Sequence, residues 1–116
     1  MEVIESVALM QSKAEELRLS GSTIGFVPTM GFLHEGHLEL MRVAGRLSDK
    51  VIVSIFVNPA QFGPQEDFAK YPRDTQGDLA KVEKVPVDIV FMPSAAEMYP
   101  EGFQSKVSVG DLSRHL

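Results

Sequence analysis

The chain has 116 residues, a formal net charge of −5 and no cysteine. This length suits one domain with a hydrophobic core, and a hydrophobic content of 44% with 23% charged residues excludes a disordered chain. The acidic balance argues against nucleic-acid binding and against binding to an anionic membrane, but it allows a small anionic ligand in one pocket. The missing cysteines exclude disulfides and thiolate metal sites, which is in keeping with a cytoplasmic protein.

The chain shows neither a signal peptide nor a membrane span. Glu2 and Glu5 stand where a signal peptide would have a basic region. The longest apolar run, Val51 to Val57, is far too short to cross a bilayer. We therefore expect a soluble protein.

The first predicted element is an amphipathic helix from about Glu5 to Leu19. Ser6 is a candidate cap, and Ser20-Gly21 ends the helix. Its apolar stripe repeats at helical spacing and consists of Val3, Ile4, Val7, Met10, Ala14 and Leu17.

A strand, a helix and a second strand follow. Thr23 to Val27 reads as a short buried strand, and an amphipathic helix then continues to about Leu47. Asp49 to Val57 is almost continuously apolar, as expected for a central strand that helices cover on both faces. The spacing of these elements is that of a βαβ unit, which predicts a parallel sheet.

The remainder of the chain continues the alternation. After a loop rich in Gly, Pro and polar residues, a third helix is predicted over Asp74 to Val85, with Thr75 and Asp78 spaced as a capping box. The fold class is therefore α/β, Rossmann-like, with a mainly parallel sheet in a three-layer α/β/α arrangement. Three further predicted elements are a buried strand over Val87 to Met92, a short helix over Ser94 to Met98 and an edge strand over Gln104 to Val109.

The stretch from Pro28 to His37 is the strongest candidate site. It follows a strand, contains Gly31 and Gly36, and opens a helix, where exposed backbone N–H groups and the helix dipole attract an anion. His34 and His37 share one helix face, and Gly36 leaves space for a ligand close to the backbone. A histidine there tends to stay neutral and can donate an N–H to a phosphate oxygen. The alternatives are a buried core histidine and a His-x-x-His metal site, for which no thiolate is available.

A second loop leaves the neighbouring strand at the same edge of the sheet. It carries Asn58 and Gln61, whose amides suit a polar substrate, followed by Tyr71 and Arg73. Carboxyl ends of parallel strands form the usual ligand crevice, so a phosphate chain beside a small polar acceptor is the expected occupant. Alternatively, Asn58 caps the strand, Gln61 is surface, and Tyr71 and Arg73 pack the loop.

Several blocks, taken in order, resemble the pantothenate synthetase (pantoate–β-alanine ligase) family, whose His-x-Gly-His element also marks the wider nucleotidyltransferase superfamily. The resemblance covers essentially the whole chain, and its blocks together are specific. They are Pro28-Thr29-Met30-Gly31-Phe32-Leu33-His34-Glu35-Gly36-His37, Val53-Ser54-Ile55-Phe56-Val57-Asn58-Pro59-Ala60-Gln61-Phe62, Glu66-Asp67 with Tyr71-Pro72-Arg73, and Val90-Phe91-Met92-Pro93 with Met98-Tyr99-Pro100.

The resemblance implies ATP-dependent joining of pantoate to β-alanine with Mg²⁺. Pantoate attacks the α-phosphate of ATP to give pantoyl adenylate and pyrophosphate, and the β-alanine amine then displaces AMP. It further implies a cytoplasmic homodimer that acts on small molecules, with neither nucleic acid nor membrane as a partner.

The resemblance also assigns roles to residues. His34 and His37 contact the phosphates, and the family's proton donor corresponds to His37. Gln61 contacts pantoate and β-alanine, with Asn58 and Met30 beside it, and Tyr71 and Arg73 belong to a loop that covers the site. No metal ligand is assigned. The implied ATP-binding residues are Pro28, Thr29, Met30, Gly31, Phe32, Leu33, His34, Glu35, Gly36 and His37.

Family members are more than twice as long as this chain. Their Gly-Glu-Lys-Asp segment, second pantoate glutamine, Ser-Ser-Arg loop and C-terminal domain have no counterpart here, and the chain stops just after Leu112-Ser113. We therefore expect residues 1–116 to be the N-terminal part of a truncated nucleotidyltransferase domain with very weak catalysis, since half of the phosphate site is missing. The alternatives are a non-catalytic binding or dimerisation fragment and another small-molecule nucleotidyltransferase, which typically shows Asp-Pro where this chain has Gly31-Phe32-Leu33.

Overall fold

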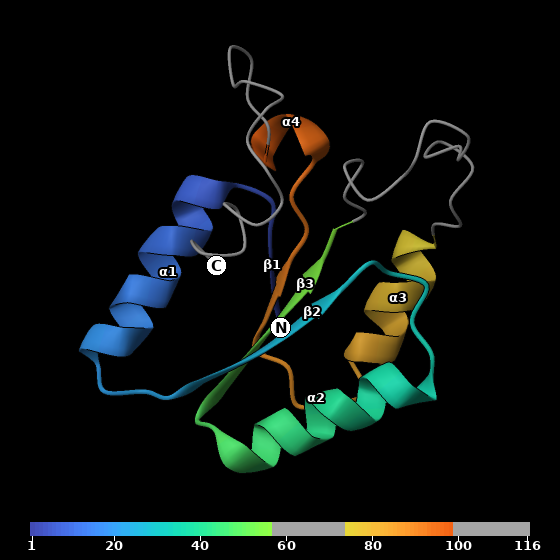
Figure 1. The fold of residues 1–116 in the computed structure, drawn as a ribbon, viewed down its shortest axis with the longest axis horizontal. Helices are drawn as coiled ribbons and strands as arrows, with labels where there is room; N and C mark the ends of the chain where they lie inside the picture. Colours follow the sequence, from blue (N-terminus) through green and yellow to red (C-terminus); the bar gives the residue numbers. More distant parts are fainter. Residues whose placement is uncertain (57–73, 99–116) are drawn as a thin grey trace, which may run out of the picture.

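Four parallel strands form the centre of the structure, a computed structural model that describes residues 1–56 and 74–98 (Figure 1). Their order across the sheet is β1-β4-β3-β2, so the two edges are β1 and β2. All three pairings between neighbours are parallel, which confirms the predicted α/β class and the parallel sheet. The strands are β1 (Glu2–Ile4), β2 (Ile24–Thr29), β3 (Lys50–Ile55) and β4 (Ile89–Phe91).

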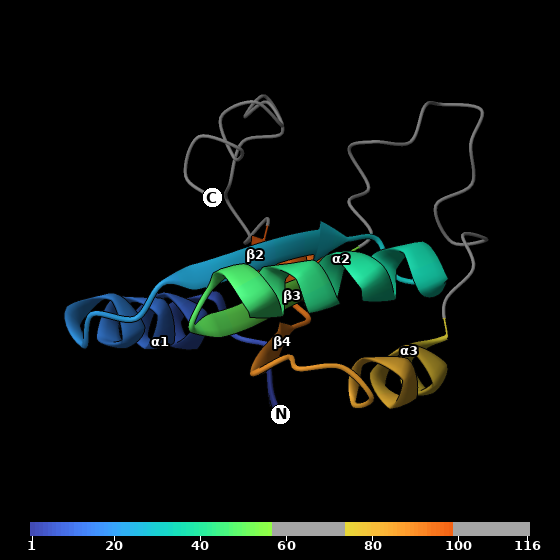
Figure 2. The same cartoon turned by 90° about the horizontal axis from the view of Figure 1, so that it is seen from below.

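Helices cover both faces of this sheet, as Figures 1 and 2 show. One core cluster joins α2 and α3 to the sheet, and a second cluster joins α1 and α4 to its other face. The predicted three-layer arrangement is therefore confirmed within the described residues. The helices are α1 (Val7–Leu19), α2 (Glu35–Leu47), α3 (Thr75–Val82) and α4 (Ala95–Met98).

The continuous apolar run in β3 follows from these two cores. Val51 and Val53 face α2 and α3, whereas Ile52 between them faces α1. All three side chains are buried. Because side chains alternate along a strand, a strand that is covered on both faces needs apolar side chains on both faces in its central part.

The N-terminus differs from the prediction. Val3 and Ile4 belong to strand β1, not to the stripe of the first helix. The Glu2 N–H donates to the Asp88 carbonyl at 2.9 Å, and the Met92 N–H donates to the Ile4 carbonyl at 2.8 Å. The helix itself begins at Val7, with Ser6 as its predicted N-cap. A three-residue strand is too short to show an alternating pattern, so helical spacing was the stronger signal.

Other boundaries also differ, and β4 is shorter than the predicted strand over Val87 to Met92. Strand β2 continues through Pro28 to Thr29, two residues beyond the predicted end, and Pro28 pairs with Ser54. Proline is tolerated there because β2 is an edge strand in the described sheet. Helix α3 ends at Val82, earlier than predicted, and its N-cap is Asp74. The predicted capping box of Thr75 and Asp78 is therefore wrong.

Two predicted features lie outside the described residues: the loop that begins at Asn58 and the edge strand from Gln104 to Val109. None of the helices in residues 1–56 and 74–98 is long and apolar enough to cross a membrane.

Candidate functional site

The candidate site is the connection from β2 to α2, at the carboxyl edge of the sheet (Figure 1). Strand β2 ends at Thr29 and α2 begins at Glu35, so the chain crosses this edge over residues 30–34. Strand β3 lies beside β2 in parallel, with Thr29 opposite Ile55. The segment that follows β3 therefore starts next to the candidate site, as predicted.

A tight turn redirects the chain after Thr29. Gly31 has φ +85° and Phe32 has φ +52°, so two successive residues lie in the left-handed region. The Thr29 hydroxyl supports the start of the turn, since it donates to the Ser54 carbonyl at 3.0 Å and accepts from the Gly31 N–H at 3.2 Å. Phe32 is an exposed non-glycine residue in this conformation, which needs support from the surrounding structure.

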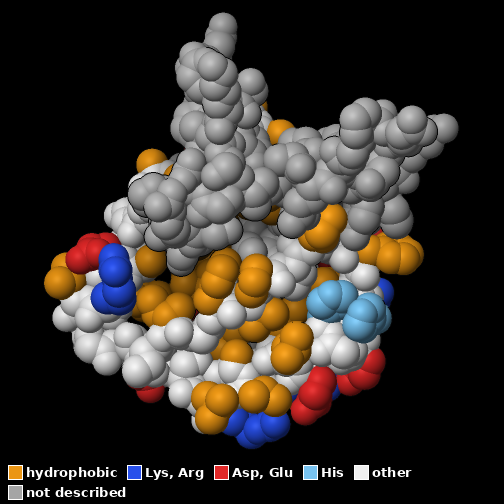
Figure 3. All heavy atoms as spheres, viewed as in Figure 1, with side chains coloured by type: hydrophobic (Ala, Val, Ile, Leu, Met, Phe, Trp, Pro, Cys, Tyr) orange, Lys and Arg blue, Asp and Glu red, His pale blue; other side chains and the backbone are white. Residues whose placement is uncertain are grey.

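His34 and His37 form a pair at the start of α2, with ring centroids 4.1 Å apart. His34 is the N-cap residue, one position earlier than a first-turn residue. Its Nδ1 accepts from the Gly36 N–H at 3.0 Å, and the His37 Nδ1 accepts from the His34 N–H at 3.1 Å. A neutral imidazole that accepts at Nδ1 carries its proton on Nε2. Each ring can therefore donate one N–H, and Figure 3 shows the histidine side chains together at the surface.

The pKa of His37 is lowered from its ordinary value, mainly by burial and then by the charge of His34, while the carboxylate of Asp78 opposes the shift. His37 therefore stays neutral at neutral pH, as a histidine at a helix N-terminus was expected to do. A neutral imidazole still offers its Nε2–H as a hydrogen-bond donor. The pair can thus donate to a phosphate group as negative charge builds on it.

Most backbone N–H groups of the turn and of the start of α2 are engaged, contrary to the prediction that they are exposed for an anion. Besides the contacts given above, the N–H groups of Phe32 and Leu33 donate to Asp78. Those of His37 and Leu38 donate to the His34 carbonyl. Anion binding at this corner therefore depends on the imidazole N–H groups and the helix dipole more than on the turn backbone.

Gly36 also serves a purpose other than the predicted one. A Cβ atom at this position would lie 2.8 Å from Cε1 of His34 and 3.0 Å from its Nδ1. The space above Gly36 is therefore occupied by the His34 ring and is not left open for a ligand.

Replacing Gly36 by Ala should displace the His34 ring with little loss of stability. The new methyl group would remove the cap contact, but alanine gains about 1 kcal/mol of helix propensity over glycine, which offsets that loss. We expect the affinity for inorganic triphosphate, a probe of the predicted phosphate site, to fall several-fold, while the free energy of unfolding stays within about 0.5 kcal/mol of wild type. Calorimetry with triphosphate and urea unfolding measure the two quantities. Unchanged triphosphate affinity would show that the position of His34 does not matter for binding.

The lowered pKa of His37 predicts acid sensitivity of the fold. The unfolded chain binds a proton at His37 near pH 6.5, whereas the folded chain does so only at lower pH. The unfolded state then holds more protons, so the free energy of unfolding decreases as the pH falls from 6.5 through the lowered pKa. Urea unfolding from neutral pH down to about pH 5.5 measures this. His37→Gln should remove part of the decrease, and an identical slope in that variant would contradict the assignment.

Asp78 is the site-forming residue that sequence reasoning missed. It is 2% exposed on α3, and its carboxylate accepts from the turn at two N–H groups. One signal was present: Asp78 stands four residues before the buried Val82 and thus on the inner face of the helix. A carboxylate on that face needs donors from another element.

The other predicted site residues are placed only in part. Met30 is half-buried in the turn, and Pro28 and Thr29 end β2. Asn58, Gln61, Tyr71 and Arg73 lie outside the described residues.

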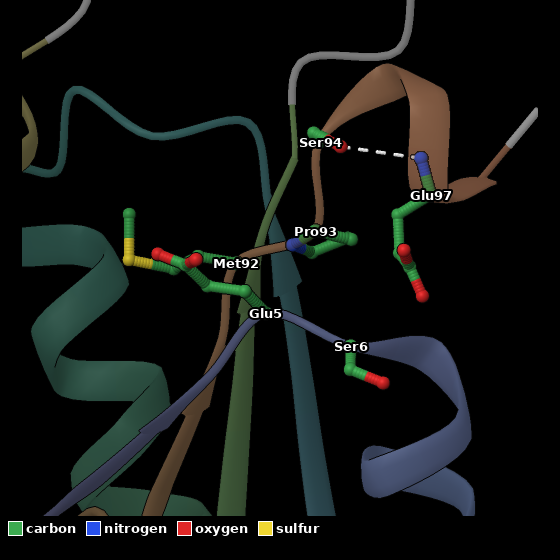
Figure 4. A pocket seen from close by; sticks show the side chains of 6 residues that line it. All are labelled: Glu5, Ser6, Met92, Pro93, Ser94 and Glu97. Atoms are coloured by element: carbon green, nitrogen blue, oxygen red, sulfur yellow. Dashed lines mark hydrogen bonds between the residues drawn. The ribbon is translucent and has the colours of Figure 1, made fainter.

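A hollow of about 360 Å³ opens at the ends of β1 and β4 (Figure 4). The Ser94 hydroxyl accepts from the Glu97 N–H there, while a carboxylate oxygen of Glu97 accepts from the Val7 N–H at 2.8 Å. Two carboxylates in the lining disfavour a phosphate group, so the histidine corner is the better anion site. The lining residues are Glu5, Ser6, Met92, Pro93, Ser94 and Glu97.

The metal alternative gains no support from the described residues. Residues 1–56 and 74–98 contain no group of three His, Cys, Asp or Glu side chains that could hold a metal ion. In addition, the Nδ1 atoms of His34 and His37 already accept backbone N–H groups.

Comparisons with known proteins point to one family. The family model described as pantoate-beta-alanine ligase matches residues 2–116. Pantothenate synthetase of Syntrophobacter fumaroxidans is 55% identical over the full chain, and that of Thermotoga petrophila is 53% identical. The chain spans 41% of the length of each of these curated relatives.

Solved structures agree with the sequence comparisons. Pantothenate synthetase from Thermus thermophilus superposes with a TM-score of 0.77 at 47% identity, over 94% of this chain and 38% of that one. Pantoate-beta-alanine ligase from Francisella tularensis superposes with a TM-score of 0.80 at 37% identity, over 98% of this chain and 46% of the other. That second structure is a complex with beta-gamma ATP and beta-alanine.

Proposed function

Because this chain belongs to the pantoate-beta-alanine ligase family, we propose that the protein carrying it joins pantoate to β-alanine at the expense of ATP. The observation that carries the proposal is the His34–His37 pair at the start of α2, whose Nδ1 atoms accept backbone N–H groups, so that Nε2–H is the donor of each ring. Residues 1–116 are then the N-terminal part of the ATP- and pantoate-binding domain.

The reaction has two steps. A carboxylate oxygen of pantoate attacks the α-phosphorus of ATP, the bond from that phosphorus to the bridging oxygen breaks, and pyrophosphate leaves. The amine of β-alanine then attacks the acyl carbon, loses a proton and displaces AMP. Negative charge grows on the phosphate oxygens in the first step, and donors aimed at these oxygens lower its barrier. His34 and His37 supply two such donors.

The remaining assignments complete the proposed site. Met30, Asn58 and Gln61 bind pantoate and β-alanine, and Tyr71 and Arg73 belong to the covering loop. ATP lies along Pro28, Thr29, Met30, Gly31, Phe32, Leu33, His34, Glu35, Gly36 and His37. The sequence resemblance to the family and the position of residues 28–37 at the carboxyl edge of the sheet support these roles.

We propose Mg²⁺ as the accompanying cation, bound through ATP. Mg²⁺ usually binds through substrate phosphates and one or two carboxylates. Mg²⁺ supplies charge neutralisation on the phosphates when it is bound. The full protein is further proposed to be a cytoplasmic homodimer, and light scattering of the purified protein measures its oligomeric state.

Pantoate-dependent exchange of pyrophosphate into ATP tests the first step, and AMP release on adding β-alanine tests the second. Both should be measured on the full natural polypeptide that carries this sequence and, in parallel, on residues 1–116 alone. We expect pyrophosphate exchange and AMP release from the full polypeptide, and only very weak pyrophosphate exchange from residues 1–116. A nucleotide transferred to an alcohol acceptor without AMP release would instead assign another nucleotidyltransferase. A folded protein that binds neither ATP nor pantoate in calorimetry would assign a non-catalytic module.

A further inference from the structure

Asp78 of α3 holds the turn that precedes the histidine pair. One carboxylate oxygen, Oδ2, accepts from the Phe32 N–H at 2.9 Å, and the other, Oδ1, accepts from the Leu33 N–H at 2.8 Å. The carboxylate is thus shared between two successive peptide groups. Since Asp78 is 2% exposed, these bonds form away from water, where hydrogen bonds to a charged group are strong.

Lys81 holds the same turn from the next position on that face of α3. Its Nζ donates to the Leu33 carbonyl at 2.9 Å. The N–H and the carbonyl of Leu33 are therefore both bound by α3, and the Leu33 side chain is itself buried, at 2% exposure. Residues three apart on a helix lie on one face, so Asp78 and Lys81 act on the turn as a unit, the turn clamp.

The turn needs such support because its backbone is unfavourable. Gly31 and Phe32 both have positive φ, and Phe32 pays a steric cost that glycine does not. Without the clamp, the turn would be expected to relax toward ordinary backbone angles. His34 follows Leu33 directly, and it contacts His37 through its backbone N–H, which donates to the His37 Nδ1, and through its ring. A shift of the turn would therefore move both rings.

We propose that Asp78 and Lys81 are positioning residues for adenylate formation, because their three hydrogen bonds to Phe32 and Leu33 fix the position of the histidine pair at the start of α2. This inference rests on the proposed function. Neither residue needs to touch substrate, since both act through the backbone of the turn. Misplacing a reacting group by about 1 Å can cost about 100-fold in rate, so the clamp should affect turnover more than substrate affinity.

The test uses the full natural polypeptide with three variants. Asp78→Asn places an amide NH₂ against one of the two N–H donors, and Lys81→Met removes the donor to Leu33 while keeping an apolar stem. Ser6→Ala is the matched control, because it removes the cap of α1 on the opposite face of the sheet. All rates are divided by the folded fraction from urea unfolding.

We expect kcat for pantoate-dependent pyrophosphate exchange to fall about 100-fold in Asp78→Asn and about tenfold in Lys81→Met. The KM for ATP should change far less, and Ser6→Ala should match wild type per folded molecule. Asp78→Glu should recover part of the lost kcat. If Asp78→Asn does not fold, Lys81→Met decides the matter. Rates per folded molecule equal to the control would overturn the proposal.

A second measurement separates the clamp from the proposed function. Hydrogen exchange at Phe32 and Leu33 should accelerate in Asp78→Asn. The pKa of His37 should also fall further in an NMR titration, because the Asp78 charge raises it against the effects of burial and His34. If wild type shows no pyrophosphate exchange although hydrogen exchange and the pKa of His37 both change in Asp78→Asn, the proposed function fails and the clamp stands as a structural device only. If neither readout changes, the clamp itself is refuted.

Discussion

His37→Ala is expected to lower adenylate formation by about 100- to 1,000-fold while costing the fold only about 1 kcal/mol. The large effect follows because the Nε2–H of a neutral imidazole is lost where charge develops on the phosphate. The small effect follows because the His37 ring is only partly buried and the His34 N–H, which loses its acceptor, is exposed. Pyrophosphate exchange and urea unfolding measure the two quantities on the full natural polypeptide.

His37→Gln is the matched control for this result. Glutamine at the third helical position can accept the N-cap N–H in the manner of a capping box, so stability should return toward wild type. Its amide does not reproduce the position of the imidazole Nε2–H, so the rate should stay low. Parallel losses of rate and stability in both variants would instead make His37 a core histidine, the alternative that the sequence left open.

The strand, helix and strand from residue 24 to residue 55 could be predicted because each element carries its own pattern. The apolar run of Val51 to Ile55 marks a strand that is covered on both faces. The apolar spacing up to Leu47 predicts α2, although it places Leu40 and Leu47 on the inner stripe, where the structure instead buries Leu38 beside Met41 and leaves those two leucines exposed. Both patterns depend only on residues that are close in the sequence, so they can be recognised without knowledge of the tertiary structure. The adjacency of β2 and β3 then followed from the length of the connection.

The features that were missed depend on partners distant in sequence. Strand β1 exists because Glu2 and Ile4 pair with β4, more than eighty positions away. Asp78 had the spacing of a local capping residue, but its carboxylate binds Phe32 and Leu33, 46 and 45 positions earlier. The capping-box spacing considers only neighbouring residues, so it gave Asp78 a role within α3. Because Asp78 is buried on the inner face of that helix, its carboxylate needs donors from another element.

The same distinction between local patterns and contacts with distant residues explains which features of the candidate site could be predicted. A turn followed by a helix N-terminus predicts free N–H groups, and the histidine pair was recognisable from its spacing. The contacts that occupy those N–H groups come from α3 and from the histidine rings themselves. The location of the site was therefore predictable, but the identity of its anion donors was not.

Met41→Ala should produce the opposite signature to His37→Ala. Met41 lies one turn after His37 on α2, is fully buried, and packs in the core between α2, α3 and the sheet. Removing most of its side chain leaves a cavity, and such changes cost about 2–5 kcal/mol. The histidine pair, the cap contacts and the turn clamp all remain. We therefore expect the urea midpoint to fall strongly while the exchange rate per folded molecule stays close to wild type.

Met41→Leu is the control for this prediction, since a swap that nearly conserves volume usually costs less than about 1.5 kcal/mol. If the rate per folded molecule of Met41→Ala falls as much as that of His37→Ala, the position of the histidine pair depends on the packing of Met41, one turn further along α2. Catalysis at this corner would then be set by the core of α2 as well as by the turn clamp. If the rate is retained, the clamp and the cap contacts are sufficient to hold the pair in place.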